Sequence, residues 1–179
     1  MTGRPEGLTA PAPLAVNRVQ APPVALYVHV PFCISICPYC DFVVYAGAAA
    51  RGPSNRIDAF LAALETEIDL RADALDAIFG RPSAPSSSGV SGAMSPGTRP
   101  PLDTLYIGGG TPSLLPDEAI ARLVELVRRR FGLAGNAEVT LEANPGPDER
   151  GDAAALVRAG IGRLSIGAQI GRASCRERV

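Results

Sequence analysis

The chain has 179 residues, of which 46% are hydrophobic, so it is long enough to bury one sizeable core. Its 17 Lys and Arg residues nearly balance its 18 Asp and Glu residues, which argues against a nucleic-acid partner or an acidic lipid surface. No apolar run is long enough to span a bilayer or to form the core of a signal peptide, so we expect a cytoplasmic protein without a membrane span. The 4 cysteines then indicate metal or redox chemistry before disulfides.

The first predicted elements surround a cysteine-rich segment. Residues 1–23 contain Pro and Gly at short intervals and are expected to form a disordered tail. The β-branched and aromatic residues over 25–30 (ALYVHV) predict a buried strand that ends at Pro31. After the cysteines, apolar residues at helical spacing predict an amphipathic helix, which Ser54 or Asn55 would cap.

The rest of the chain repeats a strand-helix pattern. Residues 80–101 are mostly Gly, Pro and Ser and are expected to form a disordered insertion. Strands are predicted over 104–107, 137–143 and 163–168, with a helix after each of the first two. This alternation predicts an α/β fold of parallel β/α units with a site at the carboxyl edge of the sheet. About four units are expected, which is too few to close a barrel.

Cys33, Cys37 and Cys40 form a C-x3-C-x2-C run on one loop. Thiolates at this spacing can hold one [4Fe-4S] cluster, and three ligands for four irons leave one iron open. An open iron can chelate S-adenosylmethionine (SAM), whose reductive cleavage gives a 5'-deoxyadenosyl radical. The alternatives are a zinc site with His29 as the fourth ligand, or plain buried thiols.

Other candidate residues lie where predicted strands end. Gly109, Gly110 and Thr111 either let a charged methionyl group lie against backbone amides or simply form a tight turn. Glu142 ends an otherwise apolar strand, so it is either a surface charge or an acceptor for SAM. Tyr27 lies in an apolar strand, where a tyrosine is more often a core residue than a ligand.

Five segments in chain order resemble the radical SAM family of oxygen-independent coproporphyrinogen III oxidases and HemW-type haem chaperones. They are LYVHVPFC, CPYCDF, YIGGGTPSLL, EVTLEANPG and GIGRLSIGAQ. Several motifs matching in order are more specific than any one of them. The resemblance implies a radical SAM core over residues 24–169, interrupted by the insertion. Its implied fold is the N-terminal part of a partial (β/α)6 barrel of the TIM type.

The resemblance also assigns roles to single residues. It makes Cys33, Cys37 and Cys40 the cluster ligands. The positions that match SAM-contacting residues of the family are Tyr27, Tyr39, Gly109, Gly110, Thr111, Glu142 and Gln169. No separate catalytic residue is implied, and His29 receives no firm role.

The residues after the third cysteine separate two functions within the family. The oxidases carry a further cysteine two residues after the third cluster ligand, whereas this chain has Asp41 and Phe42 after Cys40. The CPYCDF form resembles the HemW group, which implies a chaperone that binds haem and delivers it to acceptor proteins. The alternative is oxidative decarboxylation of coproporphyrinogen III to protoporphyrinogen IX. Both imply a reductant protein such as flavodoxin or ferredoxin.

Residues 170–179 (IGRASCRERV) break the family pattern in mid-motif. They resemble the translation of a sequencing adaptor, so we expect an artefactual tail and no role for Cys175. The chain is then expected to be truncated after Gln169. The remaining barrel strands and a C-terminal domain of the family would follow that residue.

Overall fold

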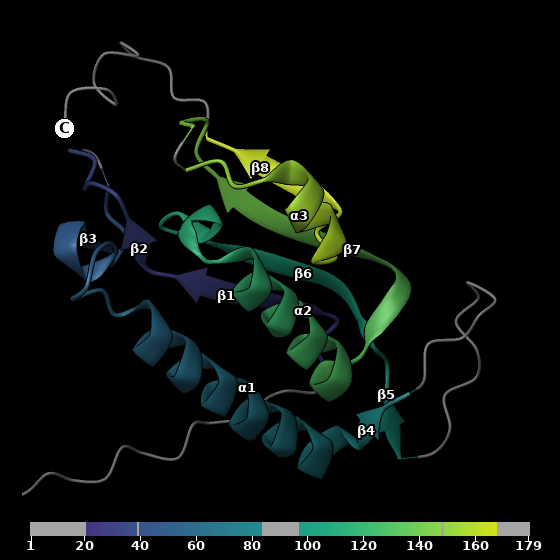
Figure 1. The fold of residues 1–179 in the computed structure, drawn as a ribbon. Helices are drawn as coiled ribbons and strands as arrows, with labels where there is room; N and C mark the ends of the chain where they lie inside the picture. Colours follow the sequence, from purple (N-terminus) through teal and green to yellow (C-terminus); the bar gives the residue numbers. More distant parts are fainter. Residues whose placement is uncertain (1–20, 39, 84–96, 148, 168–179) are drawn as a thin grey trace, which may run out of the picture.

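The computed structural model describes residues 21–38, 40–83, 97–147 and 149–167 of the chain. At its centre lies a four-stranded parallel sheet with the strand order β1-β6-β7-β8 (Figure 1). The strands are β1 (Ala25–Val30), β6 (Leu102–Gly109), β7 (Leu133–Ala143) and β8 (Arg163–Ile166). The predicted α/β class with a parallel sheet is therefore confirmed.

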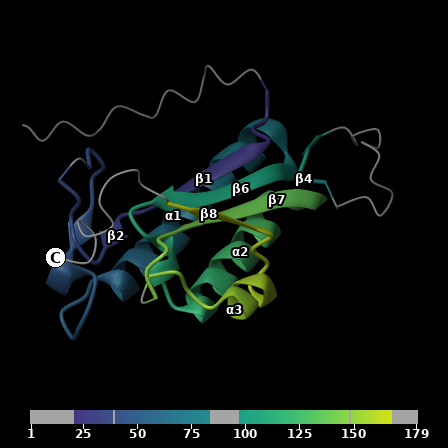
Figure 2. The same ribbon diagram turned by 90° about the horizontal axis from the view of Figure 1, so that it is seen from above.

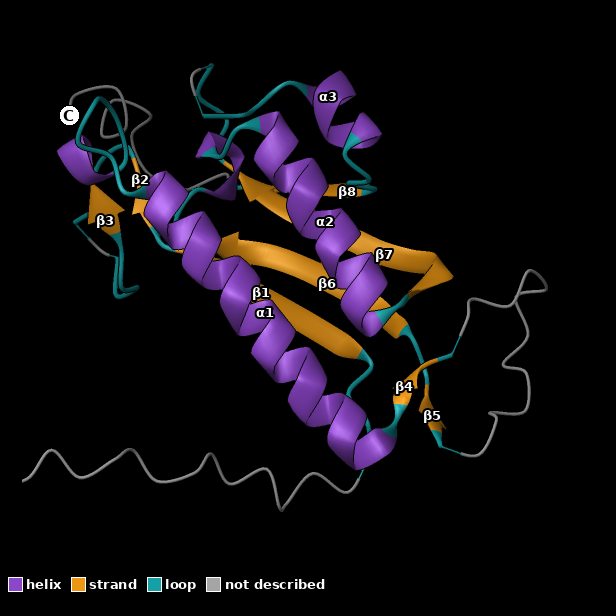
Figure 3. Ribbon diagram, turned by 60° about the horizontal axis from the view of Figure 1, so that its bottom comes forward, coloured by secondary structure: helices purple, strands orange, loops and turns teal. Residues whose placement is uncertain are grey.

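Helices connect these strands and lie on one side of the sheet (Figures 1 and 3). They are α1 (Ile57–Phe79), α2 (Asp117–Phe131) and α3 (Ala153–Arg158). The view from above in Figure 2 shows α2 and α3 on the same side of the strands. The remaining elements are short: β2 (Phe32–Cys33) with β3 (Tyr45–Ala46), β4 (Arg81–Pro82) with β5 (Thr98–Arg99), and the 3-10 turns η2 (Gly47–Ala49) and η3 (Pro112–Leu114).

The two faces of the sheet differ in chemistry. On β1, Val28 and Val30 are buried in the hydrophobic core, whereas Tyr27, on the other face, is 54% exposed. The register pairs Tyr27 with Tyr106 on β6, and Tyr106 with Thr140 on β7. Because partners in a parallel sheet share a face, hydroxyl and aromatic groups gather on the side away from the helices.

The helix ends follow from local sequence. The N-cap of α1 is Arg56, which makes no side-chain capping bond, so neither predicted capping residue holds that position. Asn55 lies one residue before it and accepts a hydrogen bond at 3.1 Å from the N–H of Ile57, the first residue of α1. Gly132 ends α2 as predicted, and its N–H donates to the carbonyl of Arg128 at 3.0 Å. The basic residues before it, Arg128–Arg130, lie in the last turn, where they complement the helix dipole.

The segment predicted to be a disordered insertion, residues 80–101, is instead ordered at both ends. These ends form the β4–β5 ladder, and the Arg99 side chain is fully buried. Its guanidinium donates at 2.9 Å to the carbonyls of Phe131 and Arg130, and at 3.0 Å to Oδ1 of Asp76. The composition of the segment did not predict this order. A single long side chain, that of Arg99, donates to the free carbonyls at the end of a helix and holds the segment there.

Several expectations fall outside the described residues. They concern most of the N-terminal tail (1–20), the middle of the insertion (84–96) and the tail at 170–179 with Cys175. The limits of the radical SAM core and the partial barrel also stay predictions. In the part of the chain that the structure describes, no helix is both long and apolar enough to cross a membrane.

Candidate functional site

The cysteine loop begins where β1 ends. Pro31 turns the chain out of β1, and the next two residues form β2, which pairs with β3 and closes the base of the loop. The N–H of Tyr45 donates to the carbonyl of Pro31 at 2.6 Å and strengthens this base. Inside the loop, the N–H of Cys40 donates to the carbonyl of Cys37 at 3.0 Å. The loop therefore has fixed ends beside the carboxyl edge of the sheet.

A pocket of about 500 Å³ lies at this edge. Its lining includes Cys33, Cys37 and Cys40 together with Gly109, Gly110, Thr111 and Glu142. Ligand pockets typically span roughly 300–1,000 Å³, so the space suits a small cofactor. The structure thus brings the three candidate cluster ligands together with four of the candidate SAM contacts from β6, β7 and the turn after β6.

The three thiols are partly exposed and none forms a disulfide. Burial raises the pKa of the Cys33 thiol, a hydrogen bond from Thr111 opposes that shift, and negative charge on Cys40 and Cys37 adds to it. Three soft sulfur donors on one loop fit an iron-sulfur cluster. Within the described ranges, no three His, Cys, Asp or Glu side chains are already arranged to hold a metal ion. The three thiols are therefore chemically suited to hold the cluster, although in this structure their sulfur atoms are not arranged as a complete metal site.

His29 does not join the thiols. Its Nδ1 lies 3.1 Å from the hydroxyl of Tyr27, and its Nε2 lies 3.4 Å from the carbonyl of Val43. Both ring nitrogens therefore have partners other than the thiols. In this arrangement the alternative of a zinc site with three cysteines and His29 lacks its fourth ligand.

The glycine turn after β6 packs directly against the cysteine loop. The N–H of Gly110 donates to the carbonyl of Val30 at 2.8 Å. A Cβ on Gly110 would lie 2.6 Å from the carbonyl oxygen of Phe32 and 3.0 Å from Sγ of Cys33. Gly109 has a φ of 115°, a conformation that side chains rarely adopt. The close approach of the turn to the loop therefore requires Gly110, whereas Gly109 is required by its φ and by the His29 ring, which a Cβ there would meet at 2.5 Å.

Thr111 is 1% exposed, and its side chain faces Cys33. Its hydroxyl oxygen lies 3.7 Å from Sγ of Cys33 and accepts a hydrogen bond at 3.1 Å from Nδ2 of Asn144. Its N–H donates to the carbonyl of Phe32 at 2.6 Å. The hydroxyl thus has protein partners on both sides, and a SAM contact at Thr111 stays a prediction.

Asn144 and Glu149 belong to this site, and the sequence reasoning missed them. Nδ2 of Asn144 donates to Oε1 of Glu149 at 2.9 Å as well as to Thr111. Asn144 directly follows β7, at the same strand end as Glu142, and that position is the signal that could have identified it. The sequence position of Glu149 gives no comparable signal, because only the folding of the loop after β7 brings this residue next to Asn144.

Both carboxylate oxygens of Glu142 are engaged by neighbouring strand residues. Oε1 accepts a hydrogen bond from the hydroxyl of Tyr106 at 2.7 Å, and Oε2 accepts one from the N–H of Gly109 at 2.8 Å. A carboxylate offers about four lone-pair positions, so acceptor capacity remains toward the pocket. Tyr106, which orients Glu142, was also missed by the sequence reasoning.

Tyr27 lies beside the pocket on the open face of the sheet. Its ring stacks on Tyr106 with 6.0 Å between ring centroids, and its hydroxyl contacts His29. Burial, followed by electrostatic interaction with Glu142 and then with Tyr106, raises the pKa of Tyr27. The core position expected from residue type is wrong, because this face of the strand is open. Tyr39 and Gln169, also predicted to contact SAM, lie outside the described residues.

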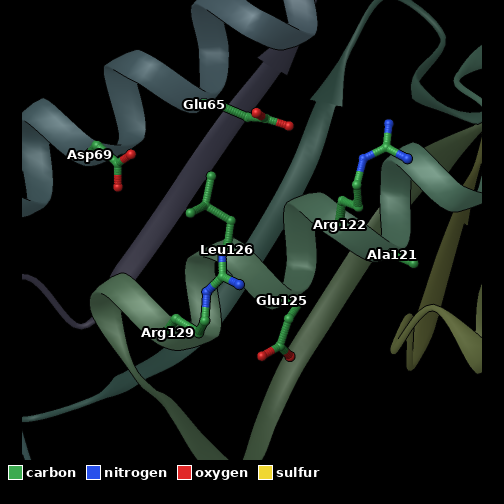
Figure 4. Close-up of a pocket in the computed structure, with 7 residues that line it drawn as sticks. All are labelled: Glu65, Asp69, Ala121, Arg122, Glu125, Leu126 and Arg129. Atoms are coloured by element: carbon green, nitrogen blue, oxygen red, sulfur yellow. The ribbon is translucent and has the colours of Figure 1, made fainter.

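A second hollow of about 530 Å³ lies between α1 and α2 (Figure 4). Side chains of both charge signs line it, among them Glu65 and Asp69 from α1 and Arg122 and Arg129 from α2. It contains no candidate cluster or SAM residue. The cysteine pocket is therefore the candidate functional site.

Parallel β/α units with a three-cysteine loop facing a glycine turn at the carboxyl edge define a radical SAM type of domain. Models of known protein families give no match to the chain. It is 40% identical over 147 residues to the heme chaperone HemW of Mycobacterium tuberculosis, covering 82% of this chain and 32% of that protein. It is 35% identical over 151 residues to the heme chaperone HemW of Escherichia coli, covering 84% and 33%.

The same class appears among solved structures. The chain is similar to the coproporphyrinogen III oxidase HemN of Escherichia coli, described as a radical SAM enzyme, with a TM-score of 0.62 and 31% identity over 83% of this chain and 28% of that chain. The chain therefore belongs to the radical SAM family of HemW-type proteins and HemN-like oxidases. It spans about a third of the length of the curated relatives that it matches.

Proposed function

We propose that this chain holds a [4Fe-4S] cluster on Cys33, Cys37 and Cys40 and binds SAM beside it, as the radical SAM core of a HemW-type haem chaperone. One observation carries the proposal: all three cysteines line the same pocket as the glycine turn and Glu142. When bound, the cluster would supply an open iron for SAM and an electron for its reductive cleavage.

The residues around the thiols suit this role. Gly109 and Gly110 contribute to the lining of the pocket, and their lack of a Cβ lets this part of the chain lie directly against His29 and the cysteine loop. Glu142 offers a carboxylate, already oriented by two hydrogen bonds, to the amino or hydroxyl groups of SAM. On the resemblance alone, Tyr27, Tyr39, Thr111 and Gln169 complete the proposed SAM contacts.

The haem assignment rests on the relatives and on one loop residue. Several matched relatives are heme chaperones, and Phe42 stands where the family's oxidases carry a cysteine. Phe42 is 63% exposed and lines the pocket, so the loop offers an aromatic ring at this point. We infer a cytoplasmic protein that receives haem, passes it to acceptor proteins and takes electrons from a flavodoxin or ferredoxin.

The second candidate is a coproporphyrinogen III oxidase. The similarity to the HemN structure favours it, because that likeness covers most of the described chain. Both candidates use the same cluster and SAM residues. They differ in whether a porphyrinogen is oxidised or haem is carried.

Cluster binding is tested by anaerobic reconstitution with iron and sulfide. We expect a brown protein with about four irons per chain, and Cys37→Ser should lose most of them. Cys175→Ser is the matched control, since that cysteine lies outside the C-x3-C-x2-C run. Stoichiometric zinc without cluster absorbance would refute the proposal.

A further inference from the structure

A chain of hydrogen bonds leads from the loop after β7 to the sulfur of Cys33. It runs from Oε1 of Glu149 through Nδ2 of Asn144 to the hydroxyl of Thr111, and from there to Sγ of Cys33. We call these residues (Glu149, Asn144 and Thr111) the sulfur relay. None of the three would contribute a sulfur atom to the cluster, and only Thr111 was among the residues predicted for the site.

The donor direction along the sulfur relay is fixed at each step. A carboxylate oxygen accepts, so the Asn144 amide must present its NH2 group to Glu149. That NH2 group has a second hydrogen, which is directed at the hydroxyl oxygen of Thr111. The hydroxyl has one hydrogen of its own, and with Asn144 on its acceptor side that hydrogen points to Cys33.

Burial keeps the hydroxyl hydrogen of Thr111 directed at Cys33. Thr111 is 1% exposed, so water does not compete for its hydroxyl. Its backbone is held as well, because its N–H donates to the carbonyl of Phe32, next to Cys33. The side chain therefore has little freedom to turn its hydrogen away from the sulfur.

We propose that Thr111 and Asn144 are positioning residues that aim a hydrogen bond at Cys33 and thereby raise the reduction potential of the cluster. A hydrogen bond to a ligand sulfur stabilises the more negative, reduced cluster, and such bonds are one determinant of cluster potential. This inference rests on the proposed function, since it requires Cys33 to be a cluster ligand.

The test is an EPR-monitored redox titration with dithionite on the anaerobically reconstituted full chain. Thr111→Val removes the hydroxyl at similar volume and should move the midpoint potential to a more negative value. At a fixed potential, the ratio of reduced to oxidised cluster should fall by a factor of at least about three. For a one-electron couple, a tenfold change in this ratio corresponds to a shift of about 59 mV in the midpoint potential. Thr111→Ser keeps the hydroxyl and should restore the wild-type potential. Thr66→Val, the same substitution at an exposed position of α1, should leave the potential unchanged.

The outcomes separate this inference from the proposed function. Asn144→Ala keeps Thr111 but frees its hydroxyl, so it should produce a smaller shift in the same direction, and it decides the matter if Thr111→Val fails to fold. A wild-type protein with a full cluster and variants with unchanged potentials would overturn the role of the sulfur relay alone. A wild-type protein that takes up no cluster would overturn the proposed function and the relay together.

Discussion

Gly110→Ala is the sharpest test of the way in which the glycine turn holds the cysteine loop. The added Cβ would lie 2.6 Å from the carbonyl oxygen of Phe32, well inside the 3.4 Å at which ordinary contacts begin. The obstructing atom belongs to the backbone of β2, so no side chain can rotate to make room. Overpacking of this kind costs about 1–3 kcal/mol, and here the strain would displace Cys33 from the pocket.

Two measurements on Gly110→Ala check this reasoning. We expect urea unfolding to show a free energy of unfolding lower by about 1–3 kcal/mol, and reconstitution to give a lower iron content. The matched control is Gly135→Ala on β7, because a Cβ there has no heavy atom within 4 Å, and its effect should stay within about 0.5 kcal/mol. Equal stability and equal iron content in the two variants would refute the packing argument.

Further predictions concern SAM, the helix anchor and turnover. Glu142→Ala should weaken SAM binding by about 1.5–3 kcal/mol, the usual loss for a hydrogen bond to a charged group, whereas Glu138→Ala on the same strand should not. An unchanged dissociation constant by calorimetry would remove Glu142 from the site. Arg99→Met should lower the free energy of unfolding by about 1–3 kcal/mol, since it breaks a partly buried ion pair and leaves carbonyls of α2 unpaired. Chemical denaturation measures this, with the exposed Arg81→Met as control, and equal values would contradict the anchor. In the protein extended to the full length of its HemW relatives, an anaerobic assay with SAM, a reductant and coproporphyrinogen III should show no turnover, while a parallel titration should show stable haem binding. Formation of protoporphyrinogen at enzymatic rates would favour the oxidase instead.

The four strands of the central sheet were predictable because burial leaves a local signature, although β7 begins at Leu133 instead of residue 137 and the short strands β2, β3, β4 and β5 were not predicted. ALYVHV is β-branched and aromatic, and β1 spans residues 25–30 as expected. Gly132 marked the end of α2 for an equally local reason, since only its own backbone conformation matters there. The approximate location of the site also followed, because polar and small residues collect where parallel strands end.

The hydrogen-bond partners were not predictable, because they depend on contacts between distant segments. Tyr106 reaches Glu142 on the neighbouring strand, and Asn144 reaches back to Thr111. Neither pair is close in sequence, so no periodicity records it. Arg99 illustrates the same limit: a segment whose composition indicates disorder is held by one side chain at the end of a helix.

The β2–β3 ladder anchors the cysteine loop at its base, so its exposed positions can vary. The Pro31 carbonyl and the Tyr45 N–H fix the two ends of the loop, and Phe32 beside them is buried in the core, whereas positions such as Val43 are exposed and contribute little to it. A chimera that carries the corresponding oxidase segment on this scaffold should therefore keep the parallel sheet. An exposed position such as Phe42 can also change during evolution at little cost to folding. Substitutions at such exposed loop positions can therefore alter the pocket while the scaffold that carries it stays the same.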